Sequence, residues 1–237
     1  MPKPVHRLYF EIAPIVSGIL KVRERVSPQQ SVLVAVSGID GSGKGYVARK
    51  LIERLQTTGQ NVAAITADAW LNLPEIRFSR SEPAKHFYRH AIRFDEMFAE
   101  VLIPLRERRS IRASVDVVEE TASSSQIRKV DFADVDVVIV EGIYLLRKSL
   151  RGHYDYSVWV NCTFETAMER AIARGQEGLS PSETTAAYQA IYFPAQRIHF
   201  FEDDPVSAAT VILDNDDRLD ATAGGIGAGV SDERFSG

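Results

Sequence analysis

The sequence is poor in cysteine, in long apolar runs and in surplus positive charge, and each shortage excludes a class of protein. Its single cysteine, Cys162, cannot form an internal disulfide or a cysteine-rich metal site. No apolar run reaches the length of a bilayer-spanning helix, and the first residues are not followed by the apolar block of a signal peptide. We therefore expect a cytoplasmic protein with no membrane partner.

The charge balance is slightly acidic, with 28 basic residues against 32 acidic ones and a net charge of −4. Proteins that bind nucleic acid usually carry a basic surplus, so we expect no nucleic-acid partner. With 237 residues, of which 45% are hydrophobic, the chain can bury the core of one α/β domain but is short for two. Homo-oligomerisation is left open by these numbers.

Short β-branched runs alternate with stretches of helical periodicity along the chain. The predicted sheet strands are residues 31–37, 61–66, 135–140, 156–161 and 209–213. The predicted helices are residues 5–26, 45–58, 94–108, 164–174 and 180–201. A strand at 111–118 followed by a polar turn at 119–125 indicates a small edge hairpin. This alternation predicts a three-layer α/β/α fold with a mostly parallel sheet of about five strands.

Changes in composition divide the chain further. We expect one domain over residues 1–215, beginning with a helix inside residues 1–27. Residues 70–95 are rich in aromatic and basic side chains and look irregular, so we interpret them as an insertion. Residues 216–237 are rich in glycine and polar residues, which predicts a flexible tail.

The most specific motif is the octapeptide from Gly38 to Gly45, which matches G-x-x-x-x-G-K between a predicted strand and a predicted helix. Glycines let the backbone wrap around phosphates with its N–H groups inward, and the next helix adds its positive end. Lys44 neutralises charge between the β- and γ-phosphates, so the motif predicts an ATP site. The expected nucleotide-binding residues are Gly38, Asp40, Gly41, Ser42, Gly43, Lys44, Gly45 and Tyr46.

Gly45 departs from the usual motif, which has serine or threonine at this position. The hydroxyl normally found there is a direct Mg²⁺ ligand. Without it, Mg²⁺ must be held by nucleotide phosphates, water and acidic side chains. The sequence therefore does not settle how tightly the site binds Mg²⁺ or whether it is catalytically active.

Two carboxylates lie where predicted strands end. Asp68 follows the strand at 61–66, and Glu141 follows the strand at 135–140. In an open parallel sheet, ligands bind beyond the carboxyl ends of the strands, so both acids should meet the phosphate loop. Asp68 is the candidate base for an attacking hydroxyl, and Glu141 is a Walker-B-like magnesium partner. Both are candidate Mg²⁺ ligands, although each alone could be a solvated loop acid.

The order of these motifs resembles that of the uridine kinases and phosphoribulokinases. The resemblance covers about residues 31–215 and includes the phosphate loop and the aspartate after the second strand. It also includes Val-Ile-Val-Glu-Gly-Ile-Tyr-Leu-Leu at 138–146 and Tyr-Phe-Pro-Ala-Gln-Arg at 192–197. The resemblance implies a P-loop kinase that uses ATP and Mg²⁺, with Asp68 activating the acceptor hydroxyl and Glu141 assisting magnesium.

The family also carries an arginine-bearing lid. Arg170 and Arg174 are four residues apart on one predicted helix, so they share a face and could clamp the transferring phosphoryl group. Residues 170–182 are the matching lid segment. Asn215 lies after the last predicted strand, where such kinases place an adenine-contacting loop. Solvated surface arginines would have the same spacing.

The acceptor site is the least specific part of the resemblance. The family places it partly in the 70–95 segment, and our candidate substrate-binding residues are Trp70, Tyr88, Arg89 and Arg197. Aromatic rings could stack on a base, and arginines could hold ring oxygens or a phosphate. The sequence Asp68-Ala69-Trp70-Leu71 departs from uridine kinases here, which weakens uridine itself as the acceptor.

The favoured function is phosphoryl transfer from ATP to a hydroxyl of a nucleoside or similar small metabolite. The alternative is a catalytically degenerate nucleotide-binding regulatory protein that lost activity with the hydroxyl at Gly45. A GTPase-type switch is disfavoured because the guanine-reading Asn-Lys-x-Asp motif is absent.

Overall fold

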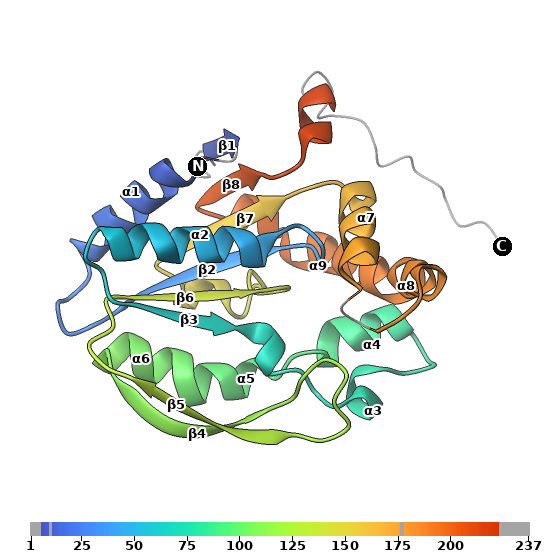
Figure 1. Ribbon diagram of the computed structural model, residues 1–237, viewed down its shortest axis with the longest axis horizontal. Helices are drawn as coiled ribbons and strands as arrows, with labels where there is room; N and C mark the ends of the chain where they lie inside the picture. The colour runs from blue at the N-terminus through green and yellow to red at the C-terminus, as the bar shows by residue number, and fades with distance from the viewer. Residues whose placement is uncertain (1–5, 10, 176–177, 223–237) are drawn as a thin grey trace.

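The computed structural model describes residues 6–9, 11–175 and 178–222. Within them, six parallel strands form one sheet in the order β1-β8-β7-β2-β6-β3 (Figure 1). These strands are β1 (His6–Tyr9), β2 (Val32–Gly38), β3 (Val62–Thr66), β6 (Val137–Gly142), β7 (Tyr156–Asn161) and β8 (Val211–Asp214). Strands β4 (Ile111–Val117) and β5 (Gln126–Phe132) form a separate antiparallel hairpin. The predicted α/β fold, with its parallel sheet and edge hairpin, is confirmed.

Strand β2 lies in the middle of the sheet, between β6 and β7, and all seven of its residues are buried. Val32, Val34 and Val36 pack into one apolar core, whereas Leu33 and Ala35 pack into another on the opposite face. This is the alternation of a strand covered on both sides, and it explains why the segment reads as a continuous apolar run.

Helices cover both faces of the sheet (Figure 1). Helices α1 (Ile12–Arg23) and α2 (Lys44–Thr57) pack on one face. The other face is covered by α5 (Phe94–Met97), a π-helical turn (Phe98–Leu102) and α6 (Ile103–Arg108), which follow one another without a break. They correspond to the single helix predicted for residues 94–108.

The 70–95 segment is more regular than its composition predicts. It contains α3 (Pro74–Arg77) and α4 (Pro83–His90), each with a proline in its first turn. A bridge from Trp70 to Val118 ties the segment to the residue that follows β4, and a second bridge, between Leu71 and Ile92, joins the two ends of the segment to each other. Proline fits the first turn of a helix because its missing N–H has no partner there anyway. The segment therefore contains two short helices where its composition predicts irregular structure.

The remaining helices lie beyond the carboxyl ends of the strands and near the C-terminus. They are α7 (Phe164–Arg174), α8 (Pro181–Ala187), a π-helical turn (Tyr188–Tyr192), α9 (Phe193–Asp203), α10 (Pro205–Ala208) and 3-10 turns at Ala67–Ala69, Arg151–His153 and Asp217–Thr222. Helix α8 begins with a capping box, in which Ser180 and Glu183 are bonded to each other's backbone N–H groups. The π turn ends at Tyr192, two residues before Pro194, and such a wider turn accommodates a residue that lacks an N–H.

The prediction of a helix from about residue 5 is wrong. Residues His6–Tyr9 instead form β1, which pairs in parallel with β8 at the sheet edge. Helix α1 begins only at Ile12, so Pro14 falls in its first turn, where proline is tolerated. Helical periodicity in residues 5–11 could not show that an open sheet edge was available to them.

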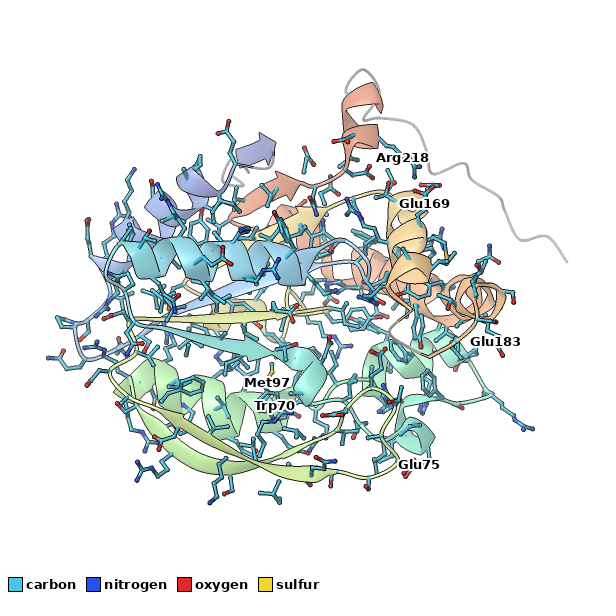
Figure 2. All side chains as sticks on the ribbon, viewed as in Figure 1. Trp70, Glu75, Met97, Glu169, Glu183 and Arg218 are labelled. Carbon is cyan, nitrogen blue, oxygen red and sulfur yellow. The ribbon has the colours of Figure 1, made fainter. Side chains whose placement is uncertain are left out.

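The predicted tail falls mostly on residues 223–237, which lie outside the described residues. The described part of it, Asp217–Thr222, is a 3-10 turn in which Arg218 donates two hydrogen bonds to Glu169 of α7, at 2.8 and 3.0 Å (Figure 2). Among the described helices, none combines the length and the apolarity that crossing a bilayer requires.

A buried polar knot joins α4, α9 and the segment after β6. The carboxylate of Asp203 accepts hydrogen bonds from the Tyr88 hydroxyl and, at 2.9 Å, from the Lys148 backbone N–H, and it lies 2.7 Å from His199 Nδ1. Burial alone would raise the pKa of Asp203, but the bonds to His199, Tyr88 and Lys148 lower it to about 2. The knot therefore stabilises the charged carboxylate in the folded state.

We expect Asp203→Asn to lower the free energy of unfolding by about 2–3 kcal/mol at pH 7, because it removes the charge that these donors stabilise. Since the pKa of Asp203 in the folded state lies below its ordinary value of 3.8, the contribution is complete above that pH and is lost as the pH falls toward 2. Urea denaturation at pH 3, 5 and 7 measures it. Glu202→Gln, an exposed neighbour, is the control. An equal loss in both variants at every pH would contradict the knot.

Candidate active site

The phosphate loop joins β2 to α2, and its glycines are required by close backbone approach. Gly41 and Gly43 have φ angles of 78° and 87°, a region that favours glycine. A Cβ atom would lie 2.4 Å from the Ala167 carbonyl oxygen at Gly41 and 2.5 Å from the Val160 carbonyl oxygen at Gly38. No side chain fits at these positions, so the backbone alone forms the loop. Helix α2 begins at Lys44, which places its N-terminal N–H groups at the loop.

A cavity of about 470 Å³ opens at this loop, in the size range of ligand sites. It collects residues from the loop, from the ends of β3 and β6, and from α3, α4, α7 and α9. Its lining residues are Asp40, Gly41, Gly43, Lys44, Gly45, Tyr46, Asp68, Leu71, Arg77, Phe87, Glu120, Glu141, Ile143, Arg170, Arg174, Tyr192 and Gln196. The predicted meeting of the loop, both acids and both arginines is thus present.

Asp40 is the centre of the charges in the cavity. Its carboxylate lies 3.7 Å from Lys44 Nζ and 3.6 Å from Arg174 Nη2, and it accepts a hydrogen bond from the Tyr188 hydroxyl. Burial alone would raise the pKa of Asp40, but Lys44 and Arg174 outweigh it and the net pKa is lowered. Asp40 therefore holds two cations of the cavity, one from the phosphate loop and one from α7. Tyr188 was not among the predicted site residues. It follows the lid segment, and no sequence motif there indicates a role for it.

The two predicted carboxylates meet because β3 and β6 are neighbours. In the register of these strands Thr66 pairs with Glu141, and Asp68 follows two residues later. Asp68 is accessible from the cavity, but the surrounding protein desolvates it and raises its pKa to about 6. Lys44 opposes this rise and the charge of Glu141 adds to it. A carboxyl group with a raised pKa beside a phosphate loop has the properties of a proton acceptor.

The two arginines of α7 line the same cavity through different contacts. Arg170 donates hydrogen bonds to the carbonyl oxygens of Ser42 and Asn215, at 3.2 and 2.8 Å. Arg174 pairs with Asp40 and lies 3.4 Å from the Tyr188 hydroxyl. The helix therefore packs its cations directly against the phosphate loop.

Three of the nucleotide-binding candidates lie around the loop but are not part of the cavity lining. Asn215 donates from Nδ2 to the Ser42 carbonyl oxygen at 2.8 Å, so it supports the loop from behind. Ser42 is itself fully buried, and Gly38 is the last residue of β2. Tyr46 lines the cavity from the first turn of α2.

The four acceptor candidates are likewise outside the cavity lining. Trp70 is buried in the same core as Met97 (Figure 2), and the Tyr88 hydroxyl belongs to the Asp203 knot. Arg89 lines a separate hollow, and the guanidinium of Arg197 stacks 4.7 Å from the Phe164 ring.

The structure brings other residues of the same segments to the cavity. Arg77 and Phe87 come from the 70–95 segment, and Tyr192 and Gln196 come from the Tyr-Phe-Pro-Ala-Gln-Arg stretch. The sequence located these segments, but which side chain of each faces inward depends on how α3, α4 and α9 are oriented. His199, on the same helix as Gln196, is fully buried in the Asp203 knot.

Metal-binding clusters are not a feature of the described residues, where no group of three or more His, Cys, Asp or Glu side chains is placed to hold an ion. The acids of the cavity could hold Mg²⁺ only together with water and phosphate oxygens, which suits an ion that keeps several waters. A Cβ atom at Gly45 would lie 4.0 Å from Glu141 Oε2 and would meet nothing closer. The space left by the missing side chain thus opens onto Glu141.

The chain is similar to known proteins in both sequence and fold. The profile of the Phosphoribulokinase / Uridine kinase family matches residues 33–180. A uridine kinase of Macrococcus caseolyticus is 31% identical over 152 residues, covering 62% of this chain and 70% of its own. The solved structure of a possible uridine kinase from Bacillus stearothermophilus covers 86% of this chain and 97% of its own, with a TM-score of 0.66 and 17% identity.

A D-glycerate 3-kinase from Cryptococcus neoformans covers 86% of this chain and 95% of its own, with a TM-score of 0.62 and 12% identity. At such identities the two solved structures establish the fold alone. The family profile spans more than half of the chain, including the phosphate loop, both acids and both arginines. The chain therefore belongs to the phosphoribulokinase and uridine kinase family of P-loop kinases.

Proposed function

We propose that the protein transfers the γ-phosphoryl group of ATP to a hydroxyl of a nucleoside or similar small metabolite. The observation that carries this proposal is the convergence of a phosphate loop, two carboxylates and two arginines on one cavity. Phosphoryl transfer needs little covalent chemistry from the protein. It depends on positioning and on stabilising negative charge, which this set of residues can supply.

The nucleotide's phosphates would take over the cations that Asp40 now holds. Lys44 and Arg174 both lie within 4 Å of Asp40 in the described state, so they already face the cavity. A triphosphate carries more negative charge than one carboxylate and offers its oxygens to the loop N–H groups. Arg170, anchored on the loop carbonyls, adds a further positive charge beside it.

Asp68 would orient the acceptor hydroxyl and accept its proton. It follows β3, lines the same cavity as the loop and feels the charges of Lys44 and Glu141, which supports this role. Mg²⁺ would be held by Glu141 and Asp68 together with phosphate oxygens and water, and when bound it neutralises charge on the transferring group. The acids fit this ion, because oxygen ligands are those that Mg²⁺ prefers.

Removing the two central side chains should separate binding from chemistry. We expect Lys44→Ala to weaken ATP binding and to abolish turnover, because it removes the cation at the β- and γ-phosphates. We expect Asp68→Asn to lower kcat by about 10²–10⁴ and to leave ATP affinity within about twofold, because asparagine keeps an oxygen that can face Mg²⁺ but cannot accept the proton. ADP release and isothermal titration with ATP measure both effects. Lys50→Ala, an exposed lysine on α2, is the control. Full turnover in Asp68→Asn would exclude it as the base.

Restoring the usual hydroxyl at position 45 should strengthen magnesium binding. We expect Gly45→Ser to raise Mg²⁺ affinity of the complex with a non-hydrolysable ATP analogue by about tenfold, because the new hydroxyl enters the open space beside Glu141. Isothermal titration of Mg²⁺ into that complex gives the affinity directly. Gly45→Ala fills the same space without a ligand atom and is the matched control. Equal affinity in the two variants would show that the hydroxyl is not needed as a ligand here.

The second candidate function is a nucleotide-binding regulatory protein without catalysis, and the observation that favours it is Gly45. ATP titration with and without Mg²⁺, followed by ADP release across a panel of metabolites, separates the two functions. ATP binding without turnover on any acceptor favours the regulatory protein.

A further inference from the structure

The wall of the cavity away from the phosphate loop contains two polar side chains that the nucleotide chemistry does not use. Arg77, at the end of α3, is 4% exposed, and Gln196, on α9, is 1% exposed. Both line the cavity. Long polar side chains are rarely buried to this degree unless a partner compensates for the lost water.

Arg77 has only partial compensation. Its Nη2 donates to the Glu120 backbone carbonyl at 2.7 Å, and its guanidinium lies 5.3 Å from the centre of the Phe78 ring. Its Nε is buried without a hydrogen-bond partner, and the charges of Glu120 and Asp68, which line the same cavity, act on it. A guanidinium stays charged at any ordinary pH and offers five donors in a planar fork. The site thus presents a buried cation with free donor capacity to the cavity.

Gln196 has no compensation within the described structure. Both Nε2 and Oε1 are buried and have no hydrogen-bond partner. A carboxamide offers two donors and an acceptor, and leaving both ends unpaired in protein is costly. An acceptor molecule that enters the cavity and bonds to both ends would remove this cost.

Arg77 is separate from the cations that serve the phosphate loop. Lys44 and Arg174 are held by Asp40, whereas Arg77 is not among its partners. Its charge instead acts on Asp68, Glu120 and Tyr192. Arg77 therefore lies on the acceptor side of the cavity, on the same side as the candidate base.

Two aromatic rings complete this wall. The rings of Phe87 and Tyr192 meet edge to face with centroids 5.0 Å apart, and both line the cavity. Leu71 and Ile143 add apolar surface. An apolar frame around few polar groups is the usual composition of a small-molecule site, and the low polarity strengthens any charge interaction inside it.

We propose that Arg77 and Gln196 form the acceptor-recognition pair of this cavity, and that the acceptor carries an anionic group, a carboxylate or a phosphate, bound by Arg77. The Gln196 amide bonds a neighbouring polar group of the same molecule, and the acceptor hydroxyl lies toward Asp68. This inference rests on the proposed function, since it names the class of acceptor for that same site. It predicts that neutral sugars and unmodified nucleosides are poorer acceptors than their anionic counterparts.

The test uses matched acceptors that differ only in an anionic group, with the full chain and MgATP. The pairs are ribitol and ribonate, uridine and orotidine, and ribose and ribose 5-phosphate. We expect kcat/KM to be at least tenfold higher for the anionic member of at least one pair, and the pair concerned tells carboxylate from phosphate. Equal or better use of the neutral members would overturn the inference while leaving the kinase function intact.

Variants then assign the preference to the two residues. We expect Arg77→Met to raise KM for the preferred anionic acceptor at least tenfold with little change in kcat, and Arg77→Lys to restore part of the loss. Gln196→Glu places a negative charge on the same wall, so it should shift the preference toward the neutral member of the pair. Unchanged ATP affinity by isothermal titration shows that each variant is folded. A preference that survives in both Arg77→Met and Gln196→Glu would refute the assignment.

Binding measurements keep this inference distinct from the proposed function. If no probe is phosphorylated, each is titrated into the complex with a non-hydrolysable ATP analogue. Binding of ribonate, orotidine or ribose 5-phosphate that Arg77→Met abolishes would support the anion site even though catalysis had failed. If none of the three binds, the inference is overturned.

Discussion

The structure depends on a loop of backbone whose glycine positions have no room for a side chain. Between Gly38 and Gly43 the chain passes so close to the end of β7 and to α7 that a Cβ atom would collide with a carbonyl oxygen at either of two positions. Glycine there leaves the N–H groups as the surface of the loop, and α2 then begins at Lys44 with its positive end at the same place. Every other part of the cavity is arranged around this loop.

The charges of the cavity are balanced internally. Asp40 holds a cation of the loop, Lys44, and a cation of α7, Arg174, while Tyr188 donates to it from the π turn before α9. Without this carboxylate the two cations would repel each other at a buried site. With it, both cations are already in position. A polyphosphate can then replace the Asp40 carboxylate as their partner, and no cation has to be brought in from solvent.

The acceptor side is held by a different interaction. Phe87 and Gln196 come from α4 and α9, and the Asp203 knot joins these two helices through Tyr88 and His199. Tyr88 directly follows Phe87, so fixing its hydroxyl also fixes the ring that faces the cavity. Tyr88, a candidate for substrate binding from sequence, thus has a structural contact that positions its neighbour.

Sequence alone determined the parallel sheet, the phosphate loop, the two acids at strand ends and the arginines on α7. These follow from local chemistry, namely β-branched runs, glycine spacing and helical periodicity, together with the rule that parallel strands bring their carboxyl ends to one edge. Tertiary structure decided that residues His6–Tyr9 pair with β8, and that Arg77 and Gln196 face the cavity in place of Trp70 and Arg197. The reason is that each of these segments contains several aromatic or polar residues of similar character, so the sequence does not show which of them lines the cavity. Only the packing angle of the element selects which one is turned inward.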